Sequence, residues 1–143
     1  MKTFSLAPGE RDMVRSVIRE ALAEEQAVVF AYLYGSFIAS GGFNDIDVAL
    51  WVDEAQMEDE GERFEYQLDL TVRIERYVRP FPVDLVLLNA APLPLRFRVV
   101  SEGEFLVSKV EAKRIEFEER TRMLSFDFLP HLDVYYEKIV PGR

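Results

Sequence analysis

Three aspartates lie at the start of two apolar runs and could together bind metal ions. Asp45 and Asp47 begin the run DIDVALWV (45–52), and Asp84 begins the apolar part of VDLVLLN (83–89). Side chains at i and i+2 of a strand share one face, with Cα atoms about 6.5–7 Å apart. If the two runs are neighbouring strands, Asp84 lies beside the pair. Three crowded carboxylates repel one another, and two divalent cations would remove that repulsion.

Such a cluster is the kind of site that carries out in-line phosphoryl or nucleotidyl transfer. A D-x-D pair by itself is more often a turn aspartate followed by a solvent-facing one. The interpretation therefore depends on whether Asp84 reaches the other two.

Gly35 and Ser36 follow the apolar run VVFAYLY (28–34) and are candidates for holding phosphate. Glycine lets the backbone approach a ligand closely, and the N–H groups of a following turn, with the Ser36 hydroxyl, suit phosphate oxygens. Residues 37–40 can form one helical turn before the glycines at 41–42. A serine at the end of a strand is also a common helix N-cap, so this pair alone leaves both interpretations open.

The surrounding segments predict an α/β (α+β) fold, a mixed sheet of about four strands with flanking helices. The predicted elements are helices over 8–25, 58–78 and 109–128, strands over 28–34, 45–52 and 83–89, and an edge strand over 105–108. Residues 90–103 could be a short helix or an irregular connection. We expect a single domain over 1–143, with a catalytic core over about 28–90 and a C-terminal helix and tail over about 109–143.

Helical spacing indicates which faces of the first two helices are buried. In the first helix the apolar stripe is Met13, Val17 and Ala21, with Leu22 beside it. In the helix over 58–78 the stripe is Phe64, Leu68 and Val72, widened by Leu70, Ile74 and Tyr77. In the tail, the aromatic residues either pack on their own domain or form an apolar surface for a partner or a second copy: Phe126, Phe128, Tyr135 and Tyr136.

Composition restricts the possible partners. The chain has 143 residues, 17 Lys and Arg against 26 Asp and Glu, and a net charge of −9. Direct binding of nucleic acid or of an anionic membrane is disfavoured, because neither is attracted to an acidic surface. No apolar run approaches the roughly 20 residues of a membrane helix, and no cysteine is present. We expect a cytoplasmic protein.

The segment YGSFIASGGFNDIDVAL (34–50) resembles the signature of the DNA polymerase β nucleotidyltransferase superfamily, a G-S pair, a short loop and D-x-D. Asp84 matches the third carboxylate of that superfamily. The chain is similar in length and element order to the minimal nucleotidyltransferases. Those proteins are often encoded beside a HEPN-domain partner in toxin–antitoxin pairs.

The resemblance implies a role for each residue. Gly35 and Ser36 would hold the β- and γ-phosphates of ATP or another nucleoside triphosphate. Asp45 and Asp47 would ligate two Mg²⁺ ions, and Asp84 would ligate the catalytic metal and help activate the incoming hydroxyl. The implied function is an antitoxin that transfers AMP to a tyrosine of a HEPN toxin ribonuclease.

Two alternatives remain at this point: a catalytically weak binding module that neutralises its partner by contact, and an enzyme that modifies a small hydroxylated molecule. The loop after Ser36 lacks the arginine that relatives often carry there, so phosphate binding would rely on the backbone, the metal and cations from elsewhere in the chain. The sequence does not choose among the candidates Arg73, Arg76, Arg79, Arg96, Arg98 and Lys109.

Overall fold

The computed structural model describes the backbone of residues 3–39 and 41–139, and the side chains of 3–39 and 41–127. Its centre is a mixed sheet with the strand order β3-β2-β1-β4. β1 is antiparallel to both β2 and β4, whereas β2 and β3 are parallel. The predicted mixed sheet and its edge strand are confirmed. The strands are β1 (Val28–Tyr34), β2 (Ile46–Val52), β3 (Val83–Leu87) and β4 (Glu104–Ser108).

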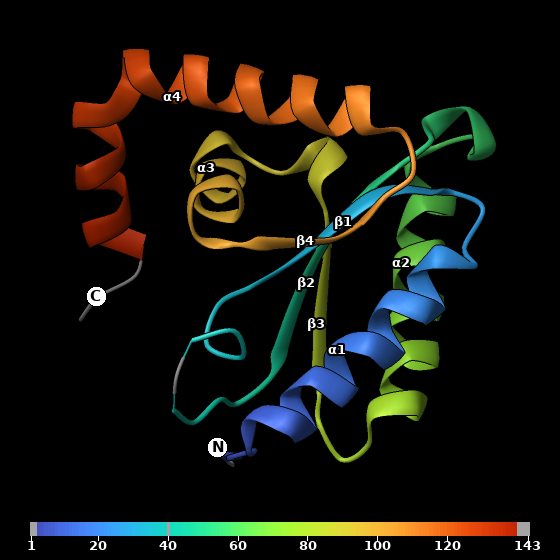
Figure 1. Ribbon diagram of the computed structural model, residues 1–143. Coiled ribbons are helices and arrows are strands. Elements are labelled where there is room, and N and C mark those ends of the chain that lie inside the picture. Colours follow the sequence, from blue (N-terminus) through green and yellow to red (C-terminus); the bar gives the residue numbers. More distant parts are fainter. Residues whose placement is uncertain (1–2, 40, 140–143) are drawn as a thin grey trace.

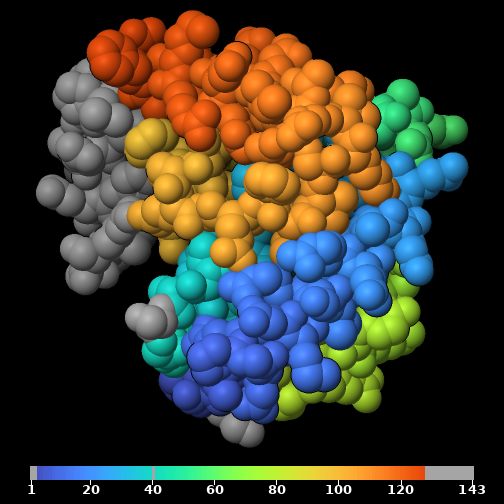
Figure 2. Space-filling model, in the orientation of Figure 1, coloured from blue at the N-terminus to red at the C-terminus, as the bar shows by residue number. Residues whose placement is uncertain are grey.

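Helices cover both faces of the sheet (Figure 1). α1 (Pro8–Ala23) and α2 (Glu60–Val78) lie on one face, and α3 (Leu93–Glu102) and α4 (Glu111–Ile139) lie on the other. In the space-filling view, α3 lies directly beneath α4 (Figure 2). The segment that the sequence left open is therefore the helix α3. Among the described residues, no helix is both long and apolar enough to cross a membrane.

The central strand β1 is buried on both sides, which explains its unbroken apolar sequence. Ala31 and Leu33 contribute to the core beneath α1 and α2. Phe30, Tyr32 and Tyr34 contribute to a second core beneath α3 and α4, where Val99 and Phe117 meet them.

The predicted buried face of α2 is wrong for its central stripe and correct for Leu70 and Ile74. Phe64, Leu68 and Val72 are 59%, 52% and 48% exposed, while Leu70 and Ile74 are buried. Successive helical residues are rotated by about 100°, so positions 68 and 70 lie on nearly opposite faces. Both stripes are apolar, and only one of them can face the sheet.

The other apolar assignments of α2 and α1 are partly corrected as well. Tyr77 is exposed at 67% and does not widen the buried face of α2. On α1, Met13 is exposed, and Ile18 and Leu22 are the residues that enter the core. Val17 is half-buried and packs against the same core.

The last helix is longer than predicted. α4 continues through Pro130 to Ile139 instead of ending at residue 128. Figure 1 shows it bending in its C-terminal part, as a proline inside a helix requires. Phe126 is 81% exposed. The other tail aromatics of the sequence analysis lie outside the residues with described side chains: Phe128, Tyr135 and Tyr136.

Candidate metal and nucleotide site

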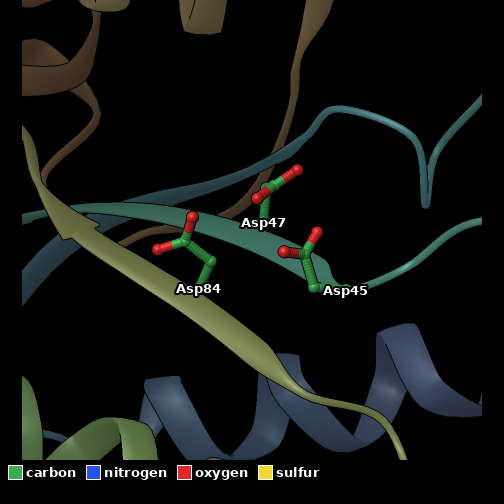
Figure 3. A group of neighbouring side chains, drawn as sticks. All are labelled: Asp45, Asp47 and Asp84. Atoms are coloured by element: carbon green, nitrogen blue, oxygen red, sulfur yellow. The ribbon is translucent and has the colours of Figure 1, made fainter. Parts of the chain in front are cut away.

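The structure brings the three aspartates together. One carboxylate oxygen from each of Asp45, Asp47 and Asp84 lies within 4.8 Å of those of the other two. Figure 3 shows the three side chains on the same side of β2 and β3, converging on one space. The predicted juxtaposition is therefore confirmed, and carboxylate oxygens are the ligands that Mg²⁺ prefers.

The parallel pairing of β2 with β3 produces this cluster. In the ladder Asp47 is directly opposite Asp84, and Ile46 is opposite Val83. The Ile46 N–H donates to the carbonyl of Pro82 over 2.9 Å. The Val83 N–H donates to a carboxylate oxygen of Glu75 on α2 over 2.8 Å. The first bond belongs to the pairing of β2 with β3, and the second attaches β3 to α2. The register of the pairing places the acids side by side.

The carboxylates are costly to keep charged without a cation. Burial raises the pKa of Asp47 to about 7, and the charges of Asp45 and Asp84 add to the rise. Burial also raises the pKa of Asp45, with Asp84 as the next cause. Divalent cations would remove this repulsion, so the site fits the metal that the sequence implies.

Gly35 lies directly against this cluster. Its φ is +80°, and a Cβ at this position would lie 2.1 Å from Oδ2 of Asp47. The glycine therefore permits two things at once, a left-handed backbone and a close approach of the Asp47 carboxylate. The sequence predicted a close backbone approach here but attributed it to the ligand.

Ser36 follows on the surface of the same loop. Its side chain is exposed, and its hydroxyl forms no hydrogen bond with the residues that the structure describes. Residues 36–38 form a turn, not the predicted helical turn over 37–40, and Ser40 lies outside the described residues. The Ser36 hydroxyl therefore does not cap a helix, and it remains available to a ligand.

Arg11 holds this loop, and sequence reasoning missed it. Its guanidinium donates to the carbonyl oxygens of Phe37 and Gly41. It also lies 5.5 Å from the ring centroid of Phe37 and 5.3 Å from that of Phe43. Both rings are buried, and Phe43 also pairs through its backbone with Phe4. The sequence offered one signal for this contact: Arg11 is a cation on α1, the helix before β1, and the loop follows β1.

Of the six candidate cations, Arg98 on α3 is the one whose charge affects the pKa of an aspartate in the cluster. Its charge opposes the rise in the pKa of Asp47, and its guanidinium lies 5.6 Å from the ring centroid of Tyr34. Arg98 also pairs with Glu102 on its own helix over 3.3 Å. Arg73 pairs with Glu25 over 2.6 Å. Arg96 lies over Trp51 and Phe117. Lys109 donates to the backbone carbonyl of Glu25.

Tyr34 is a second residue that sequence reasoning did not connect with the site. It is directly opposite Asp47 in the β1–β2 ladder. Burial raises the pKa of its hydroxyl, and the charges of Asp47 and Asp84 raise it further. The sequence placed Tyr34 in the core, which is correct for its ring.

Comparison with known proteins identifies the family. The family described as "Polymerase beta, Nucleotidyltransferase" matches residues 16–112. No curated protein matches the chain.

Several solved structures share the fold. One is the complex of a tri-AMPylated Shewanella oneidensis HEPN toxin with its MNT antitoxin, at 24% identity and a TM-score of 0.57, covering 91% of this chain and 95% of that chain. A second is the toxin–antitoxin MntA–HepT, at 22% identity and a TM-score of 0.60, covering 90% and 95%. A third is a toxin–antitoxin with AMP-PNP, at 25% identity and a TM-score of 0.56, covering 88% and 94%. Because the family match spans more than half of the sequence and includes every residue of the acidic cluster, this chain belongs to the polymerase beta nucleotidyltransferase family.

Proposed function

We propose that this protein is a Mg²⁺-dependent nucleotidyltransferase that transfers AMP from ATP to a tyrosine hydroxyl of a HEPN toxin and thereby acts as its antitoxin. The observation that carries the proposal is the convergence of three carboxylates within 4.8 Å, next to Gly35 and Ser36. The fold neighbours support the acceptor, since one of them is an MNT antitoxin in complex with a tri-AMPylated HEPN toxin.

Each residue has a role in this proposal. Asp45 and Asp47 would hold two Mg²⁺ ions, and Asp84 would be a ligand of the catalytic ion. Bound there, Mg²⁺ supplies charge neutralisation for the triphosphate and acidifies the acceptor hydroxyl. The exposed Ser36 hydroxyl and the N–H groups of its turn hold the β- and γ-phosphates. Arg98 on α3, whose charge opposes the rise in the pKa of Asp47, offsets part of the remaining negative charge.

The transfer itself is an in-line displacement. The acceptor oxygen attacks the α-phosphorus and forms a new P–O bond, while the bond to the β-phosphate oxygen breaks and pyrophosphate leaves. Asp84, which is more exposed than Asp45 and Asp47, accepts the acceptor's proton. The protein contributes positioning and charge complementarity rather than covalent chemistry.

Label transfer tests the proposal. The protein is incubated with α-labelled ATP, Mg²⁺ and its co-purifying HEPN partner, and the partner is analysed for AMP on tyrosine by mass spectrometry. We expect label on the partner with the native chain and none with Asp47→Asn. The matched control is Asp69→Asn, an exposed aspartate on α2, which should transfer as the native chain does.

Two results would contradict the proposal. A tight complex without label would indicate a binding module that silences its partner by contact. Undiminished transfer by Asp47→Asn would show that Asp47 is not a required metal ligand, even though the protein would still be a nucleotidyltransferase.

A further inference from the structure

We propose that a pocket between the sheet, α3 and α4 is a second binding site, distinct from the acidic cluster, for a small anion with a planar apolar body. The pocket has a volume of about 410 Å³, which is within the usual range for small-molecule sites. Its walls combine aromatic rings and cations: Phe30, Trp51, Phe117, Arg96, Lys113 and Arg120.

The charge of the pocket is opposite to that of the protein. Arg96, Lys113 and Arg120 line it against the one carboxylate of Glu116, in a chain whose net charge is −9. In the described part of the chain, none of these three cations forms a salt bridge. Burial lowers the pKa of Arg96, and the charge of Arg120 lowers it further. An anion in the pocket would relieve the repulsion between these two guanidinium groups.

Arg96 has an unused donor in this wall. Its Nη2 donates to the backbone carbonyl of Asn89 over 2.9 Å, but its Nε is buried and has no hydrogen-bond partner. A buried donor without a partner is costly. Guanidinium groups match carboxylates and phosphates in geometry, so the Arg96 side chain that lines the pocket suits an anionic group of either kind.

The aromatic residues account for the planar body of the ligand. Trp51 stacks on Phe30 with ring centroids 5.9 Å apart and planes 12° from parallel. Phe117 lies 5.6 Å from Trp51, tilted by 55°. The Arg96 guanidinium lies 5.7 Å from the Trp51 ring. A ligand beside these rings would meet apolar faces next to a cation, an arrangement that favours a ring bearing a negative group.

The pocket is separated from the acidic cluster by buried core. Asp47 and Trp51 are four residues apart on the same face of β2, which corresponds to about 13 Å. Ala49 lies between them and is fully buried, as is Val99 of α3 above the sheet. The pocket is therefore a separate feature from the acidic cluster, and the inference does not rest on the transfer reaction.

Trp51 is the chain's single tryptophan, so its fluorescence reports on the pocket directly. The probes are phenyl phosphate and benzoate, with benzyl alcohol as the neutral match and inorganic phosphate as the match without a ring. We expect a saturable fluorescence change with both aromatic anions, at a Kd on the order of 0.1–1 mM. Benzyl alcohol and inorganic phosphate should bind at least about tenfold more weakly, because each lacks one half of the recognised chemistry.

Variants localise the binding. Arg120→Gln should weaken phenyl phosphate by about tenfold, the loss of one charge-assisted contact. The matched control is Arg122→Gln, an exposed arginine on the same helix that does not line the pocket, and it should bind as the native chain does. Asp47→Asn should also bind normally.

Three outcomes would overturn the inference. The first is no saturable change with either aromatic anion. The second is benzyl alcohol binding as tightly as benzoate, since the cations would then be irrelevant. The third is weakening by Asp47→Asn but not by Arg120→Gln, which would assign the signal to the acidic cluster.

Discussion

Gly35 is the residue at which backbone conformation and site chemistry meet. We expect Gly35→Ala to abolish AMP transfer and to lower the free energy of unfolding by about 1–3 kcal/mol. The reason is twofold: φ is +80°, and the added Cβ would overlap the Asp47 carboxylate. Label transfer and urea unfolding measure the two effects separately.

Gly41 provides the control for this substitution. It also has a positive φ, +107°, but a Cβ there would have no neighbour within 4 Å. Gly41→Ala should therefore show the backbone cost and keep the transfer activity. Equal loss of transfer in both variants would mean that the contact with Asp47 is not what requires glycine at position 35.

Asp47 makes the stability of the metal-free protein depend on pH. Its folded-state pKa is about 7, above the ordinary 3.8, so between these values the folded state holds a proton that the unfolded state has released. The free energy of unfolding therefore falls as pH rises through this window, by about 1.4 kcal/mol per unit of pKa difference. Urea unfolding with a chelator at pH 5 and pH 8 should show the fall in the native chain.

Asp47→Asn removes the buried negative charge that destabilises the folded state at pH 8. Without metal, the variant should therefore be more stable than the native chain at this pH. Adding Mg²⁺ at pH 8 should stabilise the native chain and leave the variant almost unchanged. Asp69→Asn, remote from the cluster, should follow the native chain throughout. A native chain indifferent to both pH and Mg²⁺ would contradict the electrostatic description of the site.

At the scale of elements, α2 carries two apolar stripes. One contains Leu68 and is exposed, and the other contains Ile74 and is buried. We expect Ile74→Ala to cost about 2–4 kcal/mol of unfolding free energy, because Ile74 is fully buried. Leu68→Ala on the exposed stripe should cost less than about 1 kcal/mol. Urea unfolding of the two variants measures the difference. Equal costs would mean that the exposed stripe is covered in solution.

This helix also shows what the sequence could and could not predict. Strands were predicted well, because β1 and β2 are apolar runs bounded by glycine or charge. The acidic cluster followed from those strands once they were assumed to be neighbours. The buried face of α2 did not follow, since helical spacing identifies apolar stripes without saying which of two faces the sheet.

The sequence did not predict the roles of Arg11 and Arg98, because these depend on segments that are distant along the chain. Arg11 donates to carbonyl oxygens 26 and 30 residues away, and the charge of Arg98 acts on Asp47, which lies 51 residues before it in the sequence. No local pattern encodes such contacts. The single-domain prediction for 1–143 and the catalytic roles of the site residues stay predictions.

At the scale of the whole molecule, Glu25 joins elements that the sheet alone does not hold. It follows α1 and accepts hydrogen bonds from two nitrogens of Arg73 on α2, over 2.6 and 3.0 Å. It also accepts one from the hydroxyl of Tyr66 over 2.8 Å. Its backbone carbonyl accepts from Lys109, just after β4. One residue thus connects α1, α2 and the approach to α4.

Glu25→Gln keeps the shape of this junction and removes its charge, so it measures the charge alone. The Arg73 hydrogen bond is the main cause that lowers the pKa of Glu25 below 4.5. The stabilisation is therefore fully present above pH 4.5 and is lost as pH falls through the lowered folded-state pKa. At pH 7 we expect a cost of about 1–2 kcal/mol, reduced by salt because Arg73 is 42% exposed. Glu60→Gln, whose side chain is 95% exposed, should cost almost nothing. If Glu25→Gln were as harmless at pH 7, or if its cost persisted at a pH low enough to protonate Glu25, the junction would be held by packing and not by charge.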